Sequence, residues 1–341
     1  MGRRGEVGGP RIEPVTHPIE KTLALLHDVM AAHHDALKPR PAVPVTLPPE
    51  APSDRRASLV LRLLQGVEHY AGMEIGPAVT EKLAHLLRSL SLADLDLLVA
   101  RLGQVPAEDP EWQGLVESLT VHETYFMRNP AQMALVSAHL PALITAAARS
   151  RRHRLRLWSA GCSTGEEAYS LAVLALEALV AAGKATETPE GIVLQAPWQL
   201  EVIGADLSQP ALDQAQAGLY ATGPLSAFRN LRPDLLRFFP RGQVPQTRRV
   251  RDDVRAVVRF ERFNLVRDPP PATAFDLVSC RNVLIYLSAA ARYKARETLR
   301  RAVRRGGFLL LGATDALHGA GDFETLWGED AIIYRCRGGD A

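Results

Sequence analysis

Short apolar runs alternate with longer amphipathic segments from Arg154 towards the C-terminus, and this alternation restricts the fold more than any other feature of the 341-residue chain. The apolar runs are LRLWSAG, LEVIGAD, FDLVSC and GGFLLLGAT, and the first three are followed by helically spaced segments: GEEAYSLAVLALEALVAA, PALDQAQAGLY and AARYKARETLRRAV. Parallel strands are joined by crossover helices, so the pattern predicts an α/β fold with a mainly parallel sheet. The segment FETLWGEDAIIYRCR predicts an antiparallel hairpin at the sheet edge.

The N-terminal third has a different pattern. A helix is predicted over residues 18–37, and six prolines between Pro39 and Pro52 predict an extended linker. From Ala57 to about Leu102 apolar residues recur at helical spacing. We therefore expect a leader over residues 1–56, a small helical domain over 57–118 and a larger domain over 119–341.

The sequence predicts neither a membrane-spanning segment nor a metal site. No stretch approaches the roughly 18 uninterrupted apolar residues of a membrane span, and the first residues lack an apolar signal core. Cys162, Cys280 and Cys336 have no Cys-x-x-Cys spacing, which indicates neither a disulfide framework nor a zinc site. We expect a cytoplasmic protein without a metal centre.

Basic charge is concentrated in one segment. Between Arg229 and Arg267 there are eleven arginines and no lysine against four acids, a net charge of +7 in a chain whose net charge is +2. The alternating stretch VRAVVRFERF inside it is typical of a strand with arginines on its solvent face. We expect a small inserted β-rich lobe over about 228–262.

The loop after the first strand predicts a ligand site. Gly161 and Gly165 lie between a strand and a helix, where open α/β sheets bind ligands. The loop continues with Glu166 and Glu167 in place of the Lys-Ser/Thr of a phosphate loop, and two carboxylates would repel a triphosphate. S-adenosylmethionine, which carries a sulfonium and an ammonium group, fits better than NAD or ATP.

Two features bear on that interpretation. The second strand ends in Asp206, where an acid commonly hydrogen-bonds the ribose of an adenosine ligand, while Ser208 is placed to cap the following helix. The alternative is a capping box, pairing Ser163 with Glu166 or Thr164 with Glu167, which would support the helix and bind no ligand.

With LTVHETYFMRNP upstream and FDLVSCRNVLIYL downstream, these motifs resemble the chemotaxis-receptor methyltransferase family of CheR type, from about Gly66 to Arg337. The resemblance implies a Rossmann-like class I S-adenosylmethionine methyltransferase sheet, a small all-helical N-terminal domain and an inserted antiparallel β-subdomain. It implies methyl transfer to glutamate side chains of chemoreceptors, with S-adenosylhomocysteine as the product.

The site residues follow from the same motifs. Cofactor binding is expected at His122, Thr124, Arg128, Gly161, Glu167, Asp206, Asn264, Leu265, Arg281 and Asn282, and catalytic roles at Arg128 and Tyr286. Two positions depart from the family pattern: His122 stands where Asn is usual, and GATD replaces Gly-His-Ser-Glu near the C-terminus. Arg128 as a surface arginine and Tyr286 as a core residue are the ordinary alternatives.

The implied partner is a chemoreceptor-like protein with a Glu-rich helical methylation region. The helix that docks receptors in this family is arginine-rich, but EKLAHLLRSL offers only Lys82, His85 and Arg88. The stretch GQVPQTRRVR lacks the glycines that accompany binding of a receptor's C-terminal tether peptide, so we expect no tether binding. We further expect a monomer that binds no nucleic acid and does not insert into a membrane.

Transfer from a sulfonium to a carboxylate needs no general base, because a glutamate of pKa about 4.3 is already an anion at neutral pH. The planar guanidinium of Arg128 could hold and aim the acceptor carboxylate, and the hydroxyl of Tyr286 could add a donor. Two alternatives stay open at this point: an RNA or other S-adenosylmethionine methyltransferase that uses the arginine-rich lobe, and a non-catalytic cofactor-binding scaffold.

Overall fold

The computed structural model describes residues 52–106, 109–120, 123–312, 315, 317 and 321–337. The expected helix over 18–37 and the proline-rich linker lie outside these residues. The chain divides into two compact units, one with the residues through Gly66 and Ile75–Asp109, the other with Val67–Glu74 and the chain from Pro110 onward. The division differs from the expected boundary after residue 118, because the helix that begins at Pro110 belongs to the larger unit.

The small unit is helical, as expected. It contains most of α2 (Pro52–Ala71), together with α3 (Pro77–Leu87) and α4 (Leu92–Leu102). Leu63, Leu83 and Leu95 are completely buried. The buried Arg56 side chain donates to the carbonyls of Leu87 and Leu90 at 2.9 and 3.0 Å, and so satisfies backbone groups that the end of α3 leaves unpaired.

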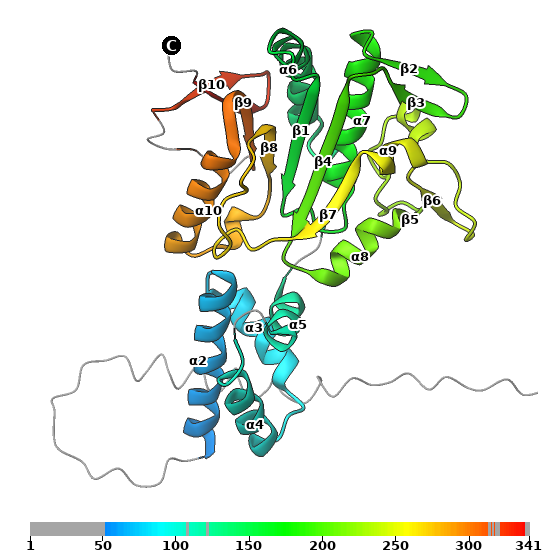
Figure 1. The fold of residues 1–341 in the computed structure, drawn as a ribbon. Helices are drawn as coiled ribbons and strands as arrows, with labels where there is room; N and C mark the ends of the chain where they lie inside the picture. The colour runs from blue at the N-terminus through cyan, green and yellow to red at the C-terminus, as the bar shows by residue number, and fades with distance from the viewer. Residues whose placement is uncertain are drawn as a thin grey trace, which may run out of the picture. The chain divides into compact units, whose positions relative to one another are not determined.

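A seven-stranded sheet forms the larger unit, with strand order β10-β11-β9-β8-β1-β4-β7 (Figure 1). β1, β4, β7, β8 and β9 pair in parallel, whereas β11 pairs antiparallel with both β9 and β10, as the sequence predicted for the terminal hairpin. The seven strands are β1 (Arg154–Ala160), β4 (Gln199–Asp206), β7 (Val258–Arg262), β8 (Phe275–Cys280), β9 (Val303–Leu311), β10 (Phe323–Trp327) and β11 (Ile332–Cys336).

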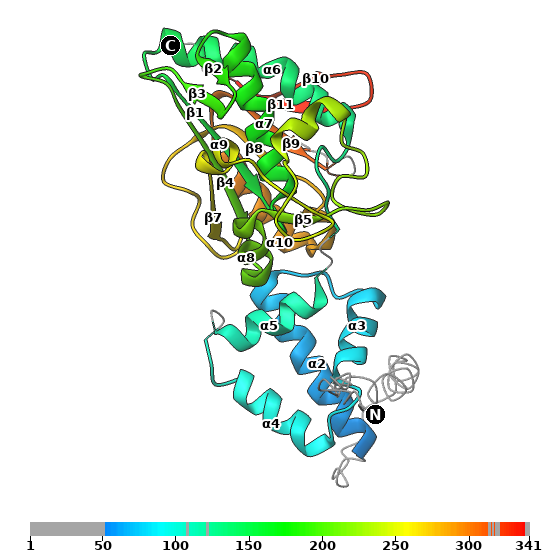
Figure 2. The ribbon, with the colours of Figure 1, turned by 90° about the vertical axis from the view of Figure 1, so that its right-hand side faces the viewer.

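Helices cover both faces of this sheet (Figures 1 and 2). Leu155 and Leu157 of β1 pack into one cluster with α6 and α7, while Trp158 and Ala160 pack into a second cluster with α10. This two-residue alternation buries both faces of the strand, as in other parallel sheets. The helices of this unit are α5 (Pro110–Leu119), α6 (Pro130–Arg149), α7 (Glu166–Ala181), α8 (Gln209–Ala217), α9 (Asp252–Ala256) and α10 (Ala289–Ala302), with two short 3₁₀ turns, η2 (Pro233–Phe238) and η3 (Leu284–Tyr286).

The inserted lobe is smaller than the sequence predicted. The expected lobe over 228–262 ends in the stretch Val258–Arg262, but that stretch is β7 and pairs with β4 in the main sheet. What remains is a two-stranded antiparallel pair, β5 (Leu219–Ala221) with β6 (Thr247–Arg249), together with η2. Alternation of apolar and charged residues marked the strand correctly but could not say which sheet it joins.

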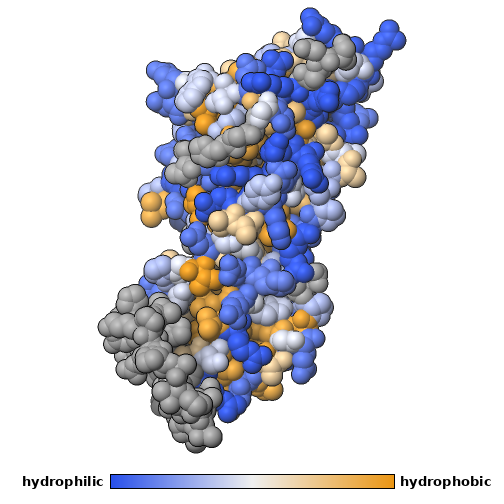
Figure 3. Space-filling view, turned by 90° about the vertical axis from the view of Figure 1, so that its left-hand side faces the viewer, coloured by the Kyte–Doolittle hydropathy of each residue, from blue (hydrophilic) through white to orange (hydrophobic). Residues whose placement is uncertain are grey.

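Two further features were not anticipated. The segment between α7 and β4 contains a hairpin of β2 (Ala185–Thr188) and β3 (Gly191–Leu194). Within the described ranges, α6 alone is long and apolar enough to cross a membrane by length and composition. Seven of its residues are nevertheless buried, and most of them belong to the core cluster it shares with α7. On the face drawn in Figure 3, apolar residues of the larger unit are scattered among hydrophilic ones.

Candidate functional site

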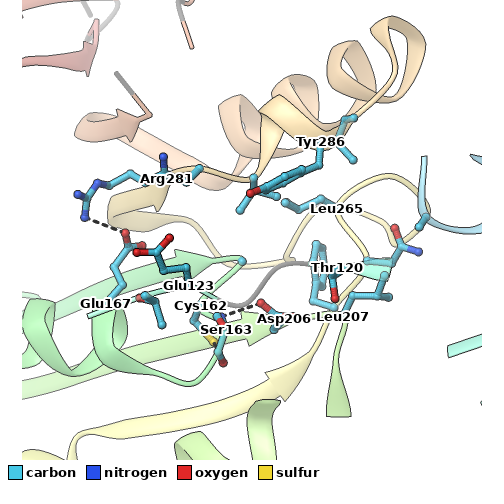
Figure 4. A pocket seen from close by; sticks show the side chains of 18 of the residues that line it. Thr120, Glu123, Cys162, Ser163, Glu167, Asp206, Leu207, Leu265, Arg281 and Tyr286 are labelled. Carbon is cyan, nitrogen blue, oxygen red and sulfur yellow. Dashed lines mark hydrogen bonds and ion pairs between the residues drawn. The ribbon is translucent and has the colours of Figure 1, made fainter. Parts of the chain in front are cut away.

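A cleft opens at the carboxyl ends of β1, β4 and β8, where the sequence predicted it. Gly161 follows β1, Asp206 ends β4, and Arg281 follows β8, and all three line the cleft (Figure 4). Because parallel strands point their carboxyl ends to one edge, segments far apart in the sequence meet there.

The loop after β1 depends on its glycines. Gly161 has φ +82°, and a Cβ there would lie 2.2 Å from Cγ2 of Val283. Gly165 has φ +94°, and its Cβ would lie 2.7 Å from Cβ of Ala215. Both positions therefore require glycine for conformation and for space.

The alternative of a capping box at this loop does not form. The N-cap of α7 is Gly165, which makes no side-chain cap, and the Thr164 hydroxyl donates to the Glu166 carboxylate at 2.7 Å. Glu166 is buried, and burial raises its pKa above the ordinary value. Glu167 instead faces the cleft. Glu166 is therefore buried against the loop, whereas Glu167 is available to a ligand in the cleft.

Asp206 is fixed by backbone donors. Its carboxylate accepts from the amide of Ser163 at 2.7 Å and from the amide of Ser208 at 3.0 Å (Figure 4 shows the first). The Ser208 hydroxyl caps α8 by accepting from the amide of Ala211 at 3.2 Å, as predicted. The acid is therefore held in one orientation on the cleft wall while the cap is supplied by another residue.

Arg281 forms part of the cleft wall, but its side chain is almost entirely buried. Its side chain is 3% exposed. Nη1 lies 3.0 Å from Oε2 of Glu167, Nε donates to Gln132 at 2.8 Å, and Nη2 donates to the carbonyl of Arg128. Burial lowers the pKa of the guanidinium, and Glu167 opposes that shift. The arginine thus orients Glu167 and the Arg128 backbone.

Two members of this network were missed by sequence reasoning. Ser159 donates to Oε1 of Glu167 at 2.8 Å, and Gln132 donates through Nε2 to the carbonyl of Leu311 at 2.7 Å while accepting from Arg281. Gln132 is 2% exposed, and Ser159 is completely buried. A polar residue among the apolar positions of α6 and another near the end of β1 were the available signals.

The Asn264 side chain forms hydrogen bonds to backbone groups next to the cleft. Its amide nitrogen donates to the carbonyl of Tyr70 at 3.0 Å, and its side-chain oxygen accepts from the amide of Val266 at 3.0 Å. Leu265, which follows it, is nearly buried and lines the cleft with Phe263. Asn264 therefore shapes a turn that presents apolar side chains to the cleft.

Arg128 and Tyr286 both line the cleft, and Arg128 is half-buried. Nη1 of Arg128 donates to the carbonyl of Glu123 at 2.6 Å, and the guanidinium carbon lies 5.8 Å from the Tyr125 ring centroid. Tyr286 is 40% exposed, so it is not a core residue, and within the described ranges its hydroxyl has no hydrogen-bond partner. Both side chains keep donors available to a molecule that enters the cleft.

The structure brings the sequence-predicted residues together. Those that line the cleft are Thr124, Arg128, Gly161, Glu167, Asp206, Asn264, Leu265, Arg281, Asn282 and Tyr286. His122 lies outside the described residues. Asn282 adopts φ +58°, a left-handed conformation that asparagine tolerates better than most residues. Among the described residues no group of three or more His, Cys, Asp or Glu side chains could hold a metal ion.

The donor set fits S-adenosylmethionine. Asp206 offers a fixed carboxylate for ribose hydroxyls, Leu265 and Phe263 offer an apolar wall for an adenine ring, and Glu167 offers negative charge for the cationic end. A side chain at Gly161 would overlap Val283, which also lines the cleft, so this part of the wall is built from backbone alone.

Comparisons with known proteins show the family to which the chain is similar. The model of the family "CheR methyltransferase, SAM binding domain" matches residues 122–332. The chain is 31% identical over 261 residues to chemotaxis protein methyltransferase 1 of Pseudomonas aeruginosa, covering 76% of this chain and 89% of that protein. It is 32% identical over 247 residues to the chemotaxis protein methyltransferase of Escherichia coli, covering 70% of this chain and 75% of that protein.

A further relative, chemotaxis protein methyltransferase Cher2 of Pseudomonas putida, is 30% identical over 263 residues, covering 76% of this chain and 89% of that protein. The family model includes most of the residues that line the cleft and most of the sheet that carries it. The chain therefore belongs to the CheR methyltransferase family and carries its S-adenosylmethionine-binding domain.

Proposed function

We propose that this protein is a protein-glutamate O-methyltransferase that uses S-adenosylmethionine to esterify glutamate side chains in the Glu-rich helices of a chemoreceptor-like protein. The observation that carries the proposal is that an arginine and a tyrosine that is 40% exposed both line the cleft that fits S-adenosylmethionine. Relatives named as chemotaxis protein methyltransferases, at 30–32% identity over most of this chain, support the choice of acceptor.

The reaction asks little of the protein beyond binding and orientation. When bound, S-adenosylmethionine supplies a methyl group on a sulfonium, whose displacement leaves a neutral thioether. The acceptor carboxylate is already ionised at neutral pH, so no residue has to remove a proton. The remaining task is to take the carboxylate out of water and aim one of its oxygens.

Arg128 and Tyr286 can perform that task. One N–H of the Arg128 guanidinium is used by the Glu123 carbonyl, which leaves four for a carboxylate. The backbone carbonyl of Arg128 is bound by the buried Arg281, so the residue that carries the guanidinium is anchored through its backbone. The Tyr286 hydroxyl can donate to the second carboxylate oxygen.

The charge of the inserted lobe speaks against a nucleic-acid substrate. Arg237 pairs with Glu177 at 2.6 Å and Glu187 at 3.2 Å, and Arg251 pairs with Asp253 at 2.6 Å. Arginines that neutralise acids of the same chain contribute little to binding phosphates. Glu177 and Glu187 lie outside the arginine-rich segment, so their pairs with Arg237 offset part of its net charge of +7, in which Asp253 is already counted.

The test is incubation with methyl-labelled S-adenosylmethionine and soluble fragments of the organism's own receptors. We expect label on glutamate, released as methanol within minutes at alkaline pH, as an ester requires. Label that is stable to base, or label that appears on RNA in place of receptor, would contradict the proposed acceptor. Absence of binding of both S-adenosylmethionine and S-adenosylhomocysteine in calorimetry would exclude an enzyme of this class.

A further inference from the structure

A second carboxylate, Glu123, lies in the cleft beside the one that the family motif assigns. The segment from Glu123 to Asn129 joins α5 to α6, and Glu123, Thr124, Tyr125 and Arg128 all line the cleft. The motif assigns roles to Thr124 and Arg128 and leaves the position between His122 and Thr124 open. The Glu123 side chain is 70% exposed, so neither folding nor core packing accounts for an acid here.

The inserted lobe holds Glu123 in place. Nη2 of Arg229 lies 3.0 Å from Oε1 of Glu123. The Arg229 guanidinium carbon lies 3.9 Å from the centroid of the Tyr125 ring, and its Nη1 donates to the carbonyls of Leu225 and Ser226 at 3.2 and 3.3 Å. An arginine with this many partners is fixed, and it fixes one oxygen of the carboxylate. In the described part of the chain the other oxygen, Oε2, has no partner.

Glu167, in contrast, has both oxygens engaged. Oε2 lies 3.0 Å from Nη1 of Arg281, and Oε1 accepts from Ser159 at 2.8 Å. In the view of Figure 4 the carboxylates of Glu123 and Glu167 are drawn near each other, and both residues line the cleft. A primary ammonium has three N–H donors and binds well only where several acceptors converge. Each oxygen of Glu167 already accepts one hydrogen bond, so Glu167 alone supplies only part of the acceptors that an ammonium group needs.

We propose that Glu123 is a second acceptor for the α-ammonium group of S-adenosylmethionine, with its free oxygen completing the site that Glu167 begins. Arg229 is then a positioning residue that connects the inserted lobe to the cofactor. The inference depends on the cofactor site and not on the identity of the methyl acceptor.

The test compares three ligands by calorimetry on the full chain without any receptor: S-adenosylmethionine, S-adenosylhomocysteine and 5′-methylthioadenosine, which lacks the amino-acid portion. We expect Glu123→Gln to weaken the first two about tenfold, the loss of one hydrogen bond to a charged group, and to leave the third within about twofold. The matched control is Glu187→Gln, because Glu187 also forms an exposed carboxylate–arginine pair, at 3.2 Å, but does not line the cleft. It should leave all three affinities unchanged.

Three results would overturn the proposal. They are unchanged affinity for S-adenosylhomocysteine in Glu123→Gln, an equal loss for 5′-methylthioadenosine, and a loss confined to S-adenosylmethionine, which would place Glu123 near the sulfonium. Thermal melting of the variant, expected to match the native protein because Glu123 is exposed, shows that the fold is retained. Since no methyl acceptor is present, a negative result leaves the proposed glutamate methylation standing.

Discussion

Replacing Gly161 by alanine tests the physical basis of the cofactor loop. Two costs are expected to add. A residue with a Cβ at φ +82° occupies a left-handed conformation that costs about 1–2 kcal/mol. The new Cβ would also lie 2.2 Å from Cγ2 of Val283, and relieving such an overlap in a packed site costs about 1–3 kcal/mol.

Gly183 provides a control that separates these two costs. It has φ +66°, yet a Cβ there would meet no heavy atom within 4 Å. Gly183→Ala therefore carries only the conformational cost. For a unit of this size about 1 kcal/mol corresponds to roughly 2–4 °C in Tm, so we expect Gly161→Ala to lower Tm by about 10 °C and Gly183→Ala by about 4 °C.

Val283→Ala isolates the overlap cost of Gly161→Ala in a second way. It removes Cγ2 and leaves Cβ, which would lie 3.4 Å from the added Cβ of residue 161. The double variant Gly161→Ala/Val283→Ala should therefore recover most of the overlap cost. The coupling free energy measured by melting should be about 1–3 kcal/mol in favour of the double variant. Equal Tm losses at Gly161 and Gly183, together with no coupling to Val283, would refute the close-approach explanation of this loop.

Three further predictions concern the cleft. Arg128→Ala should lower the rate of labelled methyl transfer about 100-fold or more, and unchanged turnover would remove Arg128 from catalysis. Calorimetry should show nearly unchanged S-adenosylmethionine affinity, because Arg281 binds the backbone carbonyl of residue 128 and that carbonyl is kept in the variant. Asp206→Ala should weaken S-adenosylmethionine binding about tenfold or more, whereas Asp213→Ala on the exposed side of α8 should not, and equal affinities in the two variants would count against a ribose contact. Burial raises the pKa of Glu166 in the folded state, so the stability that Glu166 contributes is present below its unfolded pKa and is lost as pH rises. The Tm of Glu166→Gln should therefore rise relative to that of the native protein between pH 4 and pH 7, and a Tm difference independent of pH would contradict this.

Local patterns in the sequence determined much of the fold and the outline of the site. The spacing of apolar residues located most strands and helices of the larger unit. A period of two residues reflects a strand and a period of about 3.6 residues reflects a helix, because each spacing places apolar side chains on one face of that conformation. The order of the motifs placed Gly161, Asp206 and Arg281 after successive strands, and parallel strands bring such residues to one edge whatever the details of packing. The Ser208 cap also follows from local chemistry alone.

Tertiary structure alone decided which residues become partners. Arg281 and Gln132 lie 149 positions apart and meet at the cleft wall, and no period or spacing in the chain encodes that contact. Val258–Arg262 had the pattern of an exposed strand, yet pairing with β4 made it part of the main sheet. Glu123 carries no motif signal and enters the site because Arg229 of the inserted lobe binds it. Side-chain contacts between distant segments depend on how the elements pack in three dimensions, and local sequence constrains the elements far more tightly than their packing.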